Sequence, residues 1–258
     1  MKTRTFLRNK AVGIVICFAL LASSCSKDGI QQPLSDVITA TGDSASILSS
    51  LNAFRSLLSD SLNTVPGKTG GRREINWDAV PVNLQDNNNF PSDFFAQTDP
   101  AAPNGRKRGA IFTTALTSDL RISSKGFEDV YAGLSTQIKA FSPKLILGTA
   151  NGHVIDVTFK VPGQSTDATV KGFGVIFLDV DKDNTTSLEF FDETGASLGK
   201  FFAKKSDAKF SLLGVKFKDE HKVTRVRITA GEAGIAATPG YEDKVGMDDF
   251  LYDEPVAK

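Results

Sequence analysis

The densest group of potential metal ligands is the run Asp-Val-Asp-Lys-Asp-Asn at residues 179–184. Alternate aspartates such as Asp179 and Asp181, at the end of a strand, can converge on Ca²⁺, which takes six to eight oxygen ligands. The run is not an EF-hand, because Asn184 stands where the loop glycine belongs and Phe190 where the bidentate glutamate belongs. We predict a structural calcium site with Asp179 and Asp181 as ligands. A solvated hairpin turn is the alternative, since Asp and Asn are common in turns.

A second pair of carboxylates, Asp248 and Asp249, lies inside the apolar run 247–252 near the C-terminus. If the neighbouring residues pack in a strand, one of the two points inward, and a buried carboxylate needs a cation, an arginine or several hydrogen-bond donors. Calcium held by Asp248 and Asp249 is one interpretation. An ion pair with Arg72 or Arg73 is equally consistent with the sequence, and a solvated pair is a third alternative.

The segment Arg-Arg-Glu-Ile-Asn-Trp-Asp at residues 72–78 is rich in side chains that make specific contacts, and Trp77 is the only tryptophan. Trp77 can stack on a sugar ring while Asn76 and Asp78 hydrogen-bond to its hydroxyls. We therefore name these three residues as candidate ligand-binding residues. The alternative is a first strand whose tryptophan fills the core while its charged residues form ion pairs.

Tyrosines are the other side chains that can stack on a sugar, and the chain has three. Tyr131 and Tyr241 lie in loop-like sequence, so we add them to the candidate ligand-binding residues. Phenylalanine accounts for 19 aromatic residues, and because it has no polar group its usual place is the core. A glycan is therefore one candidate class of ligand, and an envelope protein is another.

Catalytic motifs are absent from the sequence. It contains no nucleophile elbow, zinc-protease helix, P-loop or dinucleotide fingerprint. The two histidines, His153 and His221, are far apart in the chain. We predict no catalytic residues and no enzymatic activity. Glycoside hydrolysis by paired carboxylates stays as an alternative, because such pairs are recognised by their separation in space.

The elements that must position these residues are short β-strands. About ten runs rich in Phe, Val, Ile and Thr alternate with turn residues, and no helix–strand alternation favours a parallel sheet. This pattern predicts a mainly β fold, an antiparallel β-sandwich of jelly-roll type. The run 171–180 is almost continuously apolar and should be a central buried strand. The predicted strands are 109–114, 119–123, 144–148, 153–161, 171–180, 186–192, 197–203, 209–218, 222–230 and 247–252.

One amphipathic helix is expected before the sandwich, at residues 44–62. Its apolar residues fall on one face at helical spacing, and Asp43 or Ser44 can cap its start. This face either docks on the following domain or binds a partner. Residues 25–43 have the composition of a tether, and 70–255 form the β-sandwich domain. We interpret Arg106-Lys107-Arg108 as a solvated turn.

The first 24 residues are an export signal. Four basic residues precede the apolar run 11–22, which is too short to span a membrane and is typical of a signal peptide. The residues Leu-Ala-Ser-Ser-Cys at 21–25 resemble the lipobox of bacterial lipoproteins, although that motif prefers Leu where Ala22 stands. The resemblance implies cleavage before Cys25 and lipid attachment to its sulfur. Ordinary secretory cleavage near Ser24 is the alternative.

The composition excludes a nucleic-acid-binding protein. The 258 residues include 30 basic and 30 acidic side chains, and such a balance does not favour binding to a polyanion. Removal of the signal leaves 26 basic against 30 acidic residues, a net charge of −4. It also leaves Cys25 as the only cysteine, so the mature chain has no intrachain disulfide.

Several segments together resemble a family of exported, largely uncharacterised bacterial proteins. They are the Gly-Gly-Arg-Arg-Glu-Ile-Asn-Trp-Asp run at 70–78, the segments 172–192, 213–215 and 225–229, and the Met-Asp-Asp-Phe run at 247–250. The resemblance covers roughly residues 50–254 and implies a jelly-roll sandwich similar to carbohydrate-binding modules. Sugar binding follows from that likeness by analogy of fold alone.

Taken together, the sequence predicts an envelope-anchored lipoprotein with a non-catalytic β-sandwich that binds a ligand, with a glycan as the candidate class and calcium as a structural ion. We expect it in the outer membrane of a Gram-negative bacterium, facing the periplasm or the cell surface. A structural or protein-interaction module of the envelope is the second hypothesis, and a glycoside hydrolase or other hydrolase is the third.

Overall fold

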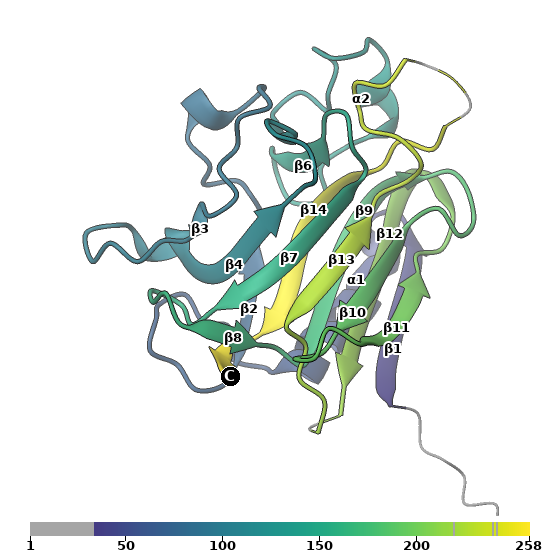
Figure 1. Ribbon diagram of the computed structural model, residues 1–258. Coiled ribbons are helices and arrows are strands. Elements are labelled where there is room, and N and C mark those ends of the chain that lie inside the picture. The colour runs from purple at the N-terminus through teal and green to yellow at the C-terminus, as the bar shows by residue number, and fades with distance from the viewer. Residues whose placement is uncertain (1–33, 219, 239, 241) are drawn as a thin grey trace, which may run out of the picture. The chain divides into compact units, whose positions relative to one another are not determined.

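The computed structural model describes residues 34–258 apart from 219, 239 and 241. Two antiparallel β-sheets pack face to face (Figure 1). The predicted fold class, a mainly β antiparallel sandwich with one helix near its start, is confirmed. The signal peptide 1–24, Cys25 and the first part of the predicted tether lie outside the described residues.

The first sheet carries both groups of aspartates. Its strand order is β1-β12-β9-β14-β6-β5, and β2 pairs with β14 beside this path. Its strands are β1 (Ser35–Gly42), β2 (Arg72–Ile75), β5 (Leu120–Ser123), β6 (Ile146–Thr149), β9 (Gly172–Val180), β12 (Ser206–Phe217) and β14 (Gly246–Asp253).

The second sheet has the order β11-β10-β13-β7-β4-β3, and beside this path β8 pairs with β7 and β15 pairs with β8. All ten strands predicted from the sequence are present in the two sheets. The second sheet contains β3 (Phe95–Ala96), β4 (Lys107–Thr113), β7 (Val154–Lys160), β8 (Asp167–Thr169), β10 (Ser187–Phe191), β11 (Ser197–Phe202), β13 (Arg225–Thr229) and β15 (Val256–Ala257).

Strand β9 is buried along its whole length, as its apolar sequence predicts. Its residues alternate between two hydrophobic clusters, because successive side chains of a strand point to opposite faces. Phe173, Val175 and Phe177 lie in the cluster between the sheets. Ile176 and Leu178 lie in the cluster on the other face. The strands that hold the aspartates are therefore fixed from both sides.

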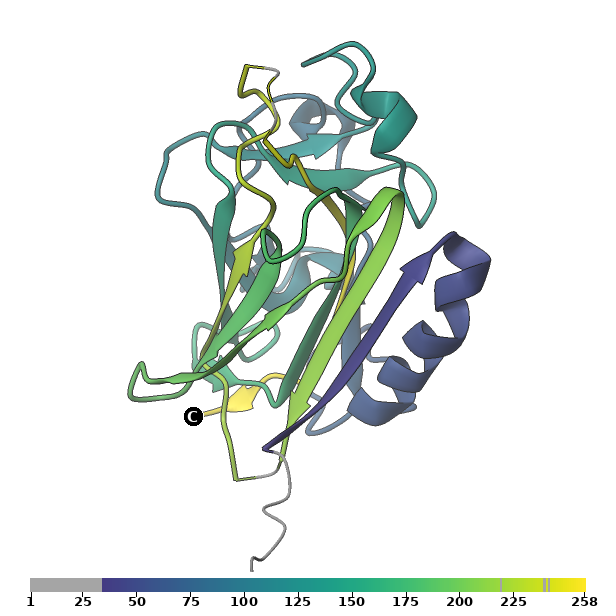
Figure 2. The ribbon, with the colours of Figure 1, turned by 90° about the vertical axis from the view of Figure 1, so that its right-hand side faces the viewer.

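Helix α1 (Ser44–Leu58) covers that other face of the first sheet, and Figure 2 shows it beside β1. Asp43 caps the helix by accepting a hydrogen bond of 2.8 Å from the Ser46 N–H. Ile47, Leu51, Phe54 and Leu58 are buried against the sheet. Docking on the domain, the first of the two roles considered for the apolar face, is what the structure shows. Shorter helices are α2 (Leu134–Gln137), η1 (Val82–Leu84) and η2 (Asn104–Arg106).

The predicted boundaries near the start of the domain need correction. Residues 35–42, assigned to the tether, form β1 and pair with β12 over their full length. The polar composition of 25–43 hid the short β-favouring run Val-Ile-Thr at 37–39. The helix ends at Leu58 rather than at residue 62. Among the described helices, none is long and apolar enough to cross a membrane.

Candidate calcium and ligand pocket

Asp179 lies near the end of β9, where the pairing with β12 is irregular. Val180 pairs with Ser206 and Leu178 with Phe210, so residues 207–209 bulge out opposite Asp179. Asp179 adopts a left-handed backbone with φ 65°, a conformation that aspartate tolerates better than most residues. Its Oδ1 accepts a hydrogen bond of 2.6 Å from the Ala208 N–H. The bulge thereby carries Asp207 toward the end of β9.

Three aspartates meet at this point. Carboxylate oxygens of Asp179, Asp181 and Asp207 all lie within 4.8 Å of one another. Two oxygens that bind one Ca²⁺ at 2.3–2.6 Å lie at most roughly 5 Å apart, so the spacing fits this ion. Burial decreases from Asp179, which is buried, through Asp181 to Asp207, which is exposed. The cluster therefore extends from the buried end of β9 to the protein surface.

Carboxylates packed this closely without a cation hold protons more tightly. Burial raises the pKa of Asp179 to about 6, and the charges of Asp181, Asp207 and Asp243 add to the effect while the Ala208 hydrogen bond opposes it. Burial also raises the pKa of Asp181, and the charges of Asp243 and Asp207 raise it further. A divalent cation at this point would supply the missing positive charge.

Asp179 and Asp181 line a pocket of about 470 Å³, whose other polar walls include Tyr131, Glu242 and Lys244. The Lys244 Nζ lies 4.6 Å from the centre of the Tyr131 ring. It also donates hydrogen bonds to the carbonyls of Ile235 and Ala237. Burial lowers the pKa of Lys244. The pocket therefore offers an aromatic ring, an ammonium group and carboxylates to one ligand.

Three residues singled out in the sequence thus converge here: Asp179, Asp181 and Tyr131. Tyr241 lies outside the described residues, although its neighbours Gly240 and Glu242 line the pocket. Sequence reasoning missed Asp207, because its approach depends on a bulge in β12. The only signal that could have found it was the polar run Lys-Lys-Ser-Asp at 204–207 between two strand patterns.

Asp248 does not belong to this cluster. It is fully buried, and its carboxylate accepts hydrogen bonds from the N–H groups of Phe141 at 2.7 Å, Ser142 at 3.1 Å and Asp249 at 2.9 Å. The Ser142 hydroxyl donates a fourth at 3.0 Å. Burial, and next the charge of Asp249, raise the pKa of Asp248 to about 8. Donors already occupy both oxygens, so we withdraw the assignment of Asp248 as a calcium ligand.

Asp249 is the extra residue of a β-bulge. Asp248 pairs with Ile176 and Phe250 with Val175, so two residues of β14 advance past one of β9. A bulge breaks the strict alternation of faces, and Asp248 and Asp249 are both buried, at 0% and 5% exposure. The expectation of a buried carboxylate held by several donors is confirmed for Asp248. Asp249 lies beside Arg55 of α1, with its Oδ2 4.0 Å from Arg55 Nη2. With a guanidinium beside it, we also withdraw Asp249 as a calcium ligand.

The arginines proposed as partners of this pair bind elsewhere. Arg72 forms an ion pair of 2.8 Å with Glu74, and Arg73 forms one of 2.7 Å with Glu254. Both members of the second pair are almost completely buried. Arg73 therefore does join the start of the domain to its end, as the sequence interpretation required, but through Glu254 rather than through Asp248 or Asp249.

Trp77 is 1% exposed and cannot stack on a ligand. Its ring makes edge contacts with those of Phe90, Phe95 and Phe250 between the sheets, so the candidate role in ligand binding is wrong and the core alternative holds. Asn76 is exposed and donates a hydrogen bond of 3.3 Å to Asp78.

Asp78, the third candidate in this segment, has a structural role. Its Oδ1 accepts a hydrogen bond of 3.1 Å from the Leu145 N–H. The carboxylate therefore joins the end of the segment to the chain just before β6.

The basic run 106–108 is not a solvated turn. Lys107 is buried, and its Nζ donates a hydrogen bond of 2.9 Å to the carbonyl of Pro100. Arg108 is half-buried, and its Nη1 donates one of 2.9 Å to the carbonyl of Asn63. The run begins β4, and strand alternation turns its side chains to different sides.

In comparisons with known proteins, neither a family model nor a curated protein matches this chain.

Proposed function

We propose that the protein is a non-catalytic binding module of the cell envelope that binds an extracellular glycan in the pocket beside Tyr131. Asp179, Asp181 and Asp207 hold Ca²⁺ at one wall of that pocket. The observation that carries the proposal is the convergence of Asp179, Asp181 and the Tyr131 ring on a single cavity, with Asp207 completing the carboxylate cluster at its wall. The sequence predicts Asp179 and Asp181 as calcium ligands and Tyr131 as a sugar-stacking residue, and nothing in the sequence order requires them to meet, since they come from separate segments.

The chemistry of the pocket favours a hydroxylated ligand. Ca²⁺ takes six to eight oxygens, and three carboxylates that each give one or two leave positions on the pocket side. Neighbouring hydroxyls of a sugar are oxygen ligands of the right kind. The Tyr131 ring offers a surface for the apolar face of a sugar, and Glu242 and Lys244 offer an acceptor and a donor.

Attachment to the envelope is the second part of the proposal. The basic and apolar segments before Cys25 direct export, and lipid on the Cys25 sulfur then anchors the chain. The tether that remains, residues 26–34, separates the anchor from β1. A protein held in this way samples ligands at the membrane surface without needing high affinity for a soluble form.

Binding of the purified protein to a glycan array, in calcium and in EDTA, tests the ligand class. We expect saturable binding to one glycan class in calcium, at least tenfold weaker binding in EDTA, and about tenfold losses in Asp181→Asn and Tyr131→Ala. Asp36→Asn, an exposed residue of β1, is the charge-matched control and should bind normally. A blank array from a folded sample, or binding that neither variant weakens, would overturn the glycan assignment.

A further inference from the structure

A second pocket, of about 250 Å³, lies where two motifs of the sequence meet. Asp249 of β14 lines it together with Glu74 and Asn76 from the segment 72–78. Arg55 of α1 and Arg108 of β4 complete its polar walls, with Leu62 and Thr64 beside them. None of these residues lines the calcium pocket. The role of the segment 72–78 and of the aspartate pair, unexplained by the first pocket, can therefore be sought here.

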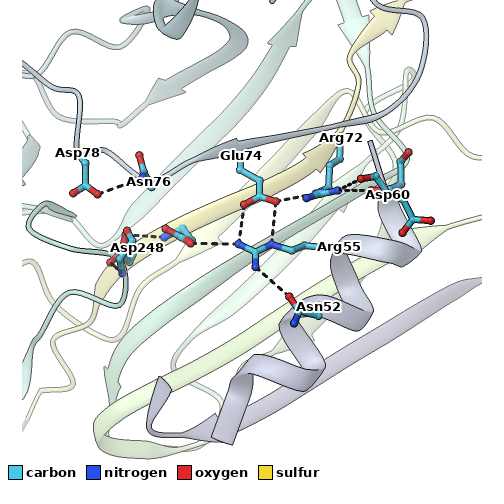
Figure 3. Close-up of polar contacts among 11 residues, drawn as sticks. Asn52, Arg55, Asp60, Arg72, Glu74, Asn76, Asp78 and Asp248 are labelled. Atoms are coloured by element: carbon cyan, nitrogen blue, oxygen red, sulfur yellow. Dashed lines mark hydrogen bonds and ion pairs between the residues drawn. The ribbon is translucent and has the colours of Figure 1, made fainter. Parts of the chain in front are cut away.

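Two of the four charged groups are already paired with each other. Arg55 Nε donates a hydrogen bond of 3.0 Å to Glu74 Oε1, and its Nη2 donates one of 2.9 Å to Oε2 (Figure 3). Arg72 adds a third donor to Glu74 at 2.8 Å. Arg55 and Glu74 thus hold each other in place at the wall of the pocket, and their charges are already paired without a ligand.

Asp249 is the carboxylate with an unpaired oxygen. It is 5% exposed, and its buried Oδ1 has no hydrogen-bond partner among the described residues. The nearest cation to its Oδ2 is Arg55 Nη2 at 4.0 Å, beyond hydrogen-bonding distance. Burial raises the pKa of Asp249, the Ser142 side chain and the charge of Arg55 oppose this effect, and the charge of Glu74 adds to it. An unmatched buried carboxylate of this kind is costly unless something donates to it.

Arg108 is the complementary group. Its side chain is half-buried and donates to a neutral carbonyl, that of Asn63. The nearby carboxylates of Glu74 and Glu254 form their ion pairs with Arg55, Arg72 and Arg73 rather than with Arg108. Burial lowers the pKa of Arg108, while Tyr252 and the charges of Glu254 and Glu74 oppose this effect and the charge of Arg73 adds to it. The pocket thus holds one carboxylate oxygen, Asp249 Oδ1, that accepts no hydrogen bond from the described residues, and one guanidinium, that of Arg108, whose hydrogen bond goes to a neutral carbonyl.

We propose that this pocket binds a small zwitterion, a free α-amino acid, whose ammonium group lies at Asp249 and whose carboxylate lies at Arg108. Arg55 and Arg108 balance Glu74 and Asp249, so the pocket carries no net charge that would favour a simple anion or a simple cation. A carboxylate matches the planar fork of a guanidinium. A sugar of similar size offers hydroxyl dipoles but neither an ammonium group for Asp249 nor a carboxylate for Arg108.

The size of the pocket agrees with this class. A volume of about 250 Å³ equals the share of roughly eight water molecules in the liquid. That suits a molecule of amino-acid size and excludes a bound oligosaccharide. Leu62 and Thr64 are exposed beside the pocket, so they would contact the side chain of the amino acid rather than its charged groups.

The test is thermal unfolding and calorimetric titration of the purified protein with each common α-amino acid in turn. We expect at least one to bind and raise the melting temperature. Its methyl ester, which lacks the carboxylate, and its N-acetyl derivative, which lacks the ammonium group, should each bind at least tenfold more weakly, because each loses a charge-assisted contact. Common monosaccharides, as probes of the competing class, should not bind at this pocket.

Two variants locate the site. Asp249→Asn and Arg108→Gln should each weaken binding at least tenfold, while the exposed controls Asp36→Asn and Lys68→Gln should bind like the wild type. The proposal is overturned if no amino acid binds, if the two derivatives bind as well as the free acid, or if both variants keep full affinity. The derivatives are tested on the wild-type protein, so the proposal stays falsifiable even if a variant fails to fold.

Discussion

At the scale of single residues, the protein buries several carboxylates with donors but without full counter-charges. Asp253 accepts hydrogen bonds from the N–H groups of Lys171 at 2.8 Å and Gly172 at 2.7 Å, and burial still raises its pKa to about 6. Burial likewise raises the pKa of Asp179 and of Asp248, although each accepts a hydrogen bond from a backbone N–H group. In the unfolded chain an aspartate has a pKa near 3.9. The folded protein therefore binds more protons than the unfolded chain at intermediate pH.

The stability of the folded protein should therefore decrease as the pH rises. The free energy of unfolding falls with rising pH wherever the folded state binds more protons. The contribution of each such group is fully present below about pH 4 and is lost as the pH rises through its folded pKa. The stabilising contribution of Asp179 and of Asp253 is lost by about pH 6, and that of Asp248 by about pH 8. Without calcium, the protein should be less stable at pH 8 than at pH 5.

The variant Asp249→Asn should reduce this loss. It removes the charge that, after burial, most raises the pKa of Asp248, so less stability is lost as Asp248 ionises. We expect the difference in unfolding free energy between pH 5 and pH 8 to shrink by about 1 kcal/mol. Urea unfolding at the two pH values measures it. An unchanged difference, with Asp36→Asn as the control for loss of an exposed charge, would contradict the coupling of the two aspartates.

At the scale of elements, α1 docks because β9 and β12 leave room for one large side chain. Gly174 and Gly214 pair with each other in adjacent strands, and the ring of Phe54 lies on both. A Cβ placed on Gly214 would lie 2.6 Å from the Phe54 ring, far inside normal contact distance. The two glycines therefore allow the Phe54 ring, and with it α1, to pack closely on the sheet.

Gly214→Ala should destabilise the protein by about 1–3 kcal/mol, the usual cost of overpacking a core. The double variant with Phe54→Leu should cost less than the two single variants added together, because the smaller side chain relieves the clash. Gly70→Ala is the matched control, since nothing lies within 4 Å of its added Cβ. Chemical denaturation of the wild type and of the four variants measures these effects. Strict additivity of the Gly214→Ala and Phe54→Leu costs would show that the Phe54 ring does not pack on Gly214.

Most strands could be predicted from the sequence, and the reasons for the misses are physical. The long apolar run of β9 and the alternation along β13 are local signals. Strands β8 and β15, with three and two residues, are too short to show a period. The bulges at 207–209 and at Asp249 depend on pairing with β9, which no local pattern contains. These bulges decide which aspartates meet, so the sequence predicted Asp179 and Asp181 together but misplaced Asp248 and Asp249.

At the scale of the whole molecule, a buried network closes the domain by joining its first and last segments. Strand β2 pairs with β14, and the Arg73–Glu254 ion pair lies beside this pairing with both side chains at 1% exposure or less. The amide of Asn63 donates a hydrogen bond of 2.8 Å to the other Glu254 oxygen. Residues nearly two hundred positions apart thus depend on one another.

Arg73→Met should cost about 3–5 kcal/mol of unfolding free energy, because it leaves Glu254 buried without its cation. The double variant Arg73→Met/Glu254→Met should recover much of this loss, since neither charge then stays unpaired. Lys160→Met breaks the exposed pair with Asp167 and should cost less than about 1 kcal/mol. Equal costs for the buried and exposed pairs, measured by guanidinium denaturation, would refute this account of how the domain closes.

The most direct test of the proposed calcium site is the thermal unfolding of the wild type and of Asp181→Asn, each in EDTA and in excess calcium. In EDTA the variant should be at least as stable as the wild type, because it relieves repulsion among three close carboxylates. At about a hundred times the dissociation constant, calcium should stabilise the wild type by about 2.7 kcal/mol and the variant far less, so that their order of stability reverses. Identical melting of the wild type in calcium and in EDTA, or an equal response of both proteins, would contradict the calcium site on which the proposed function rests.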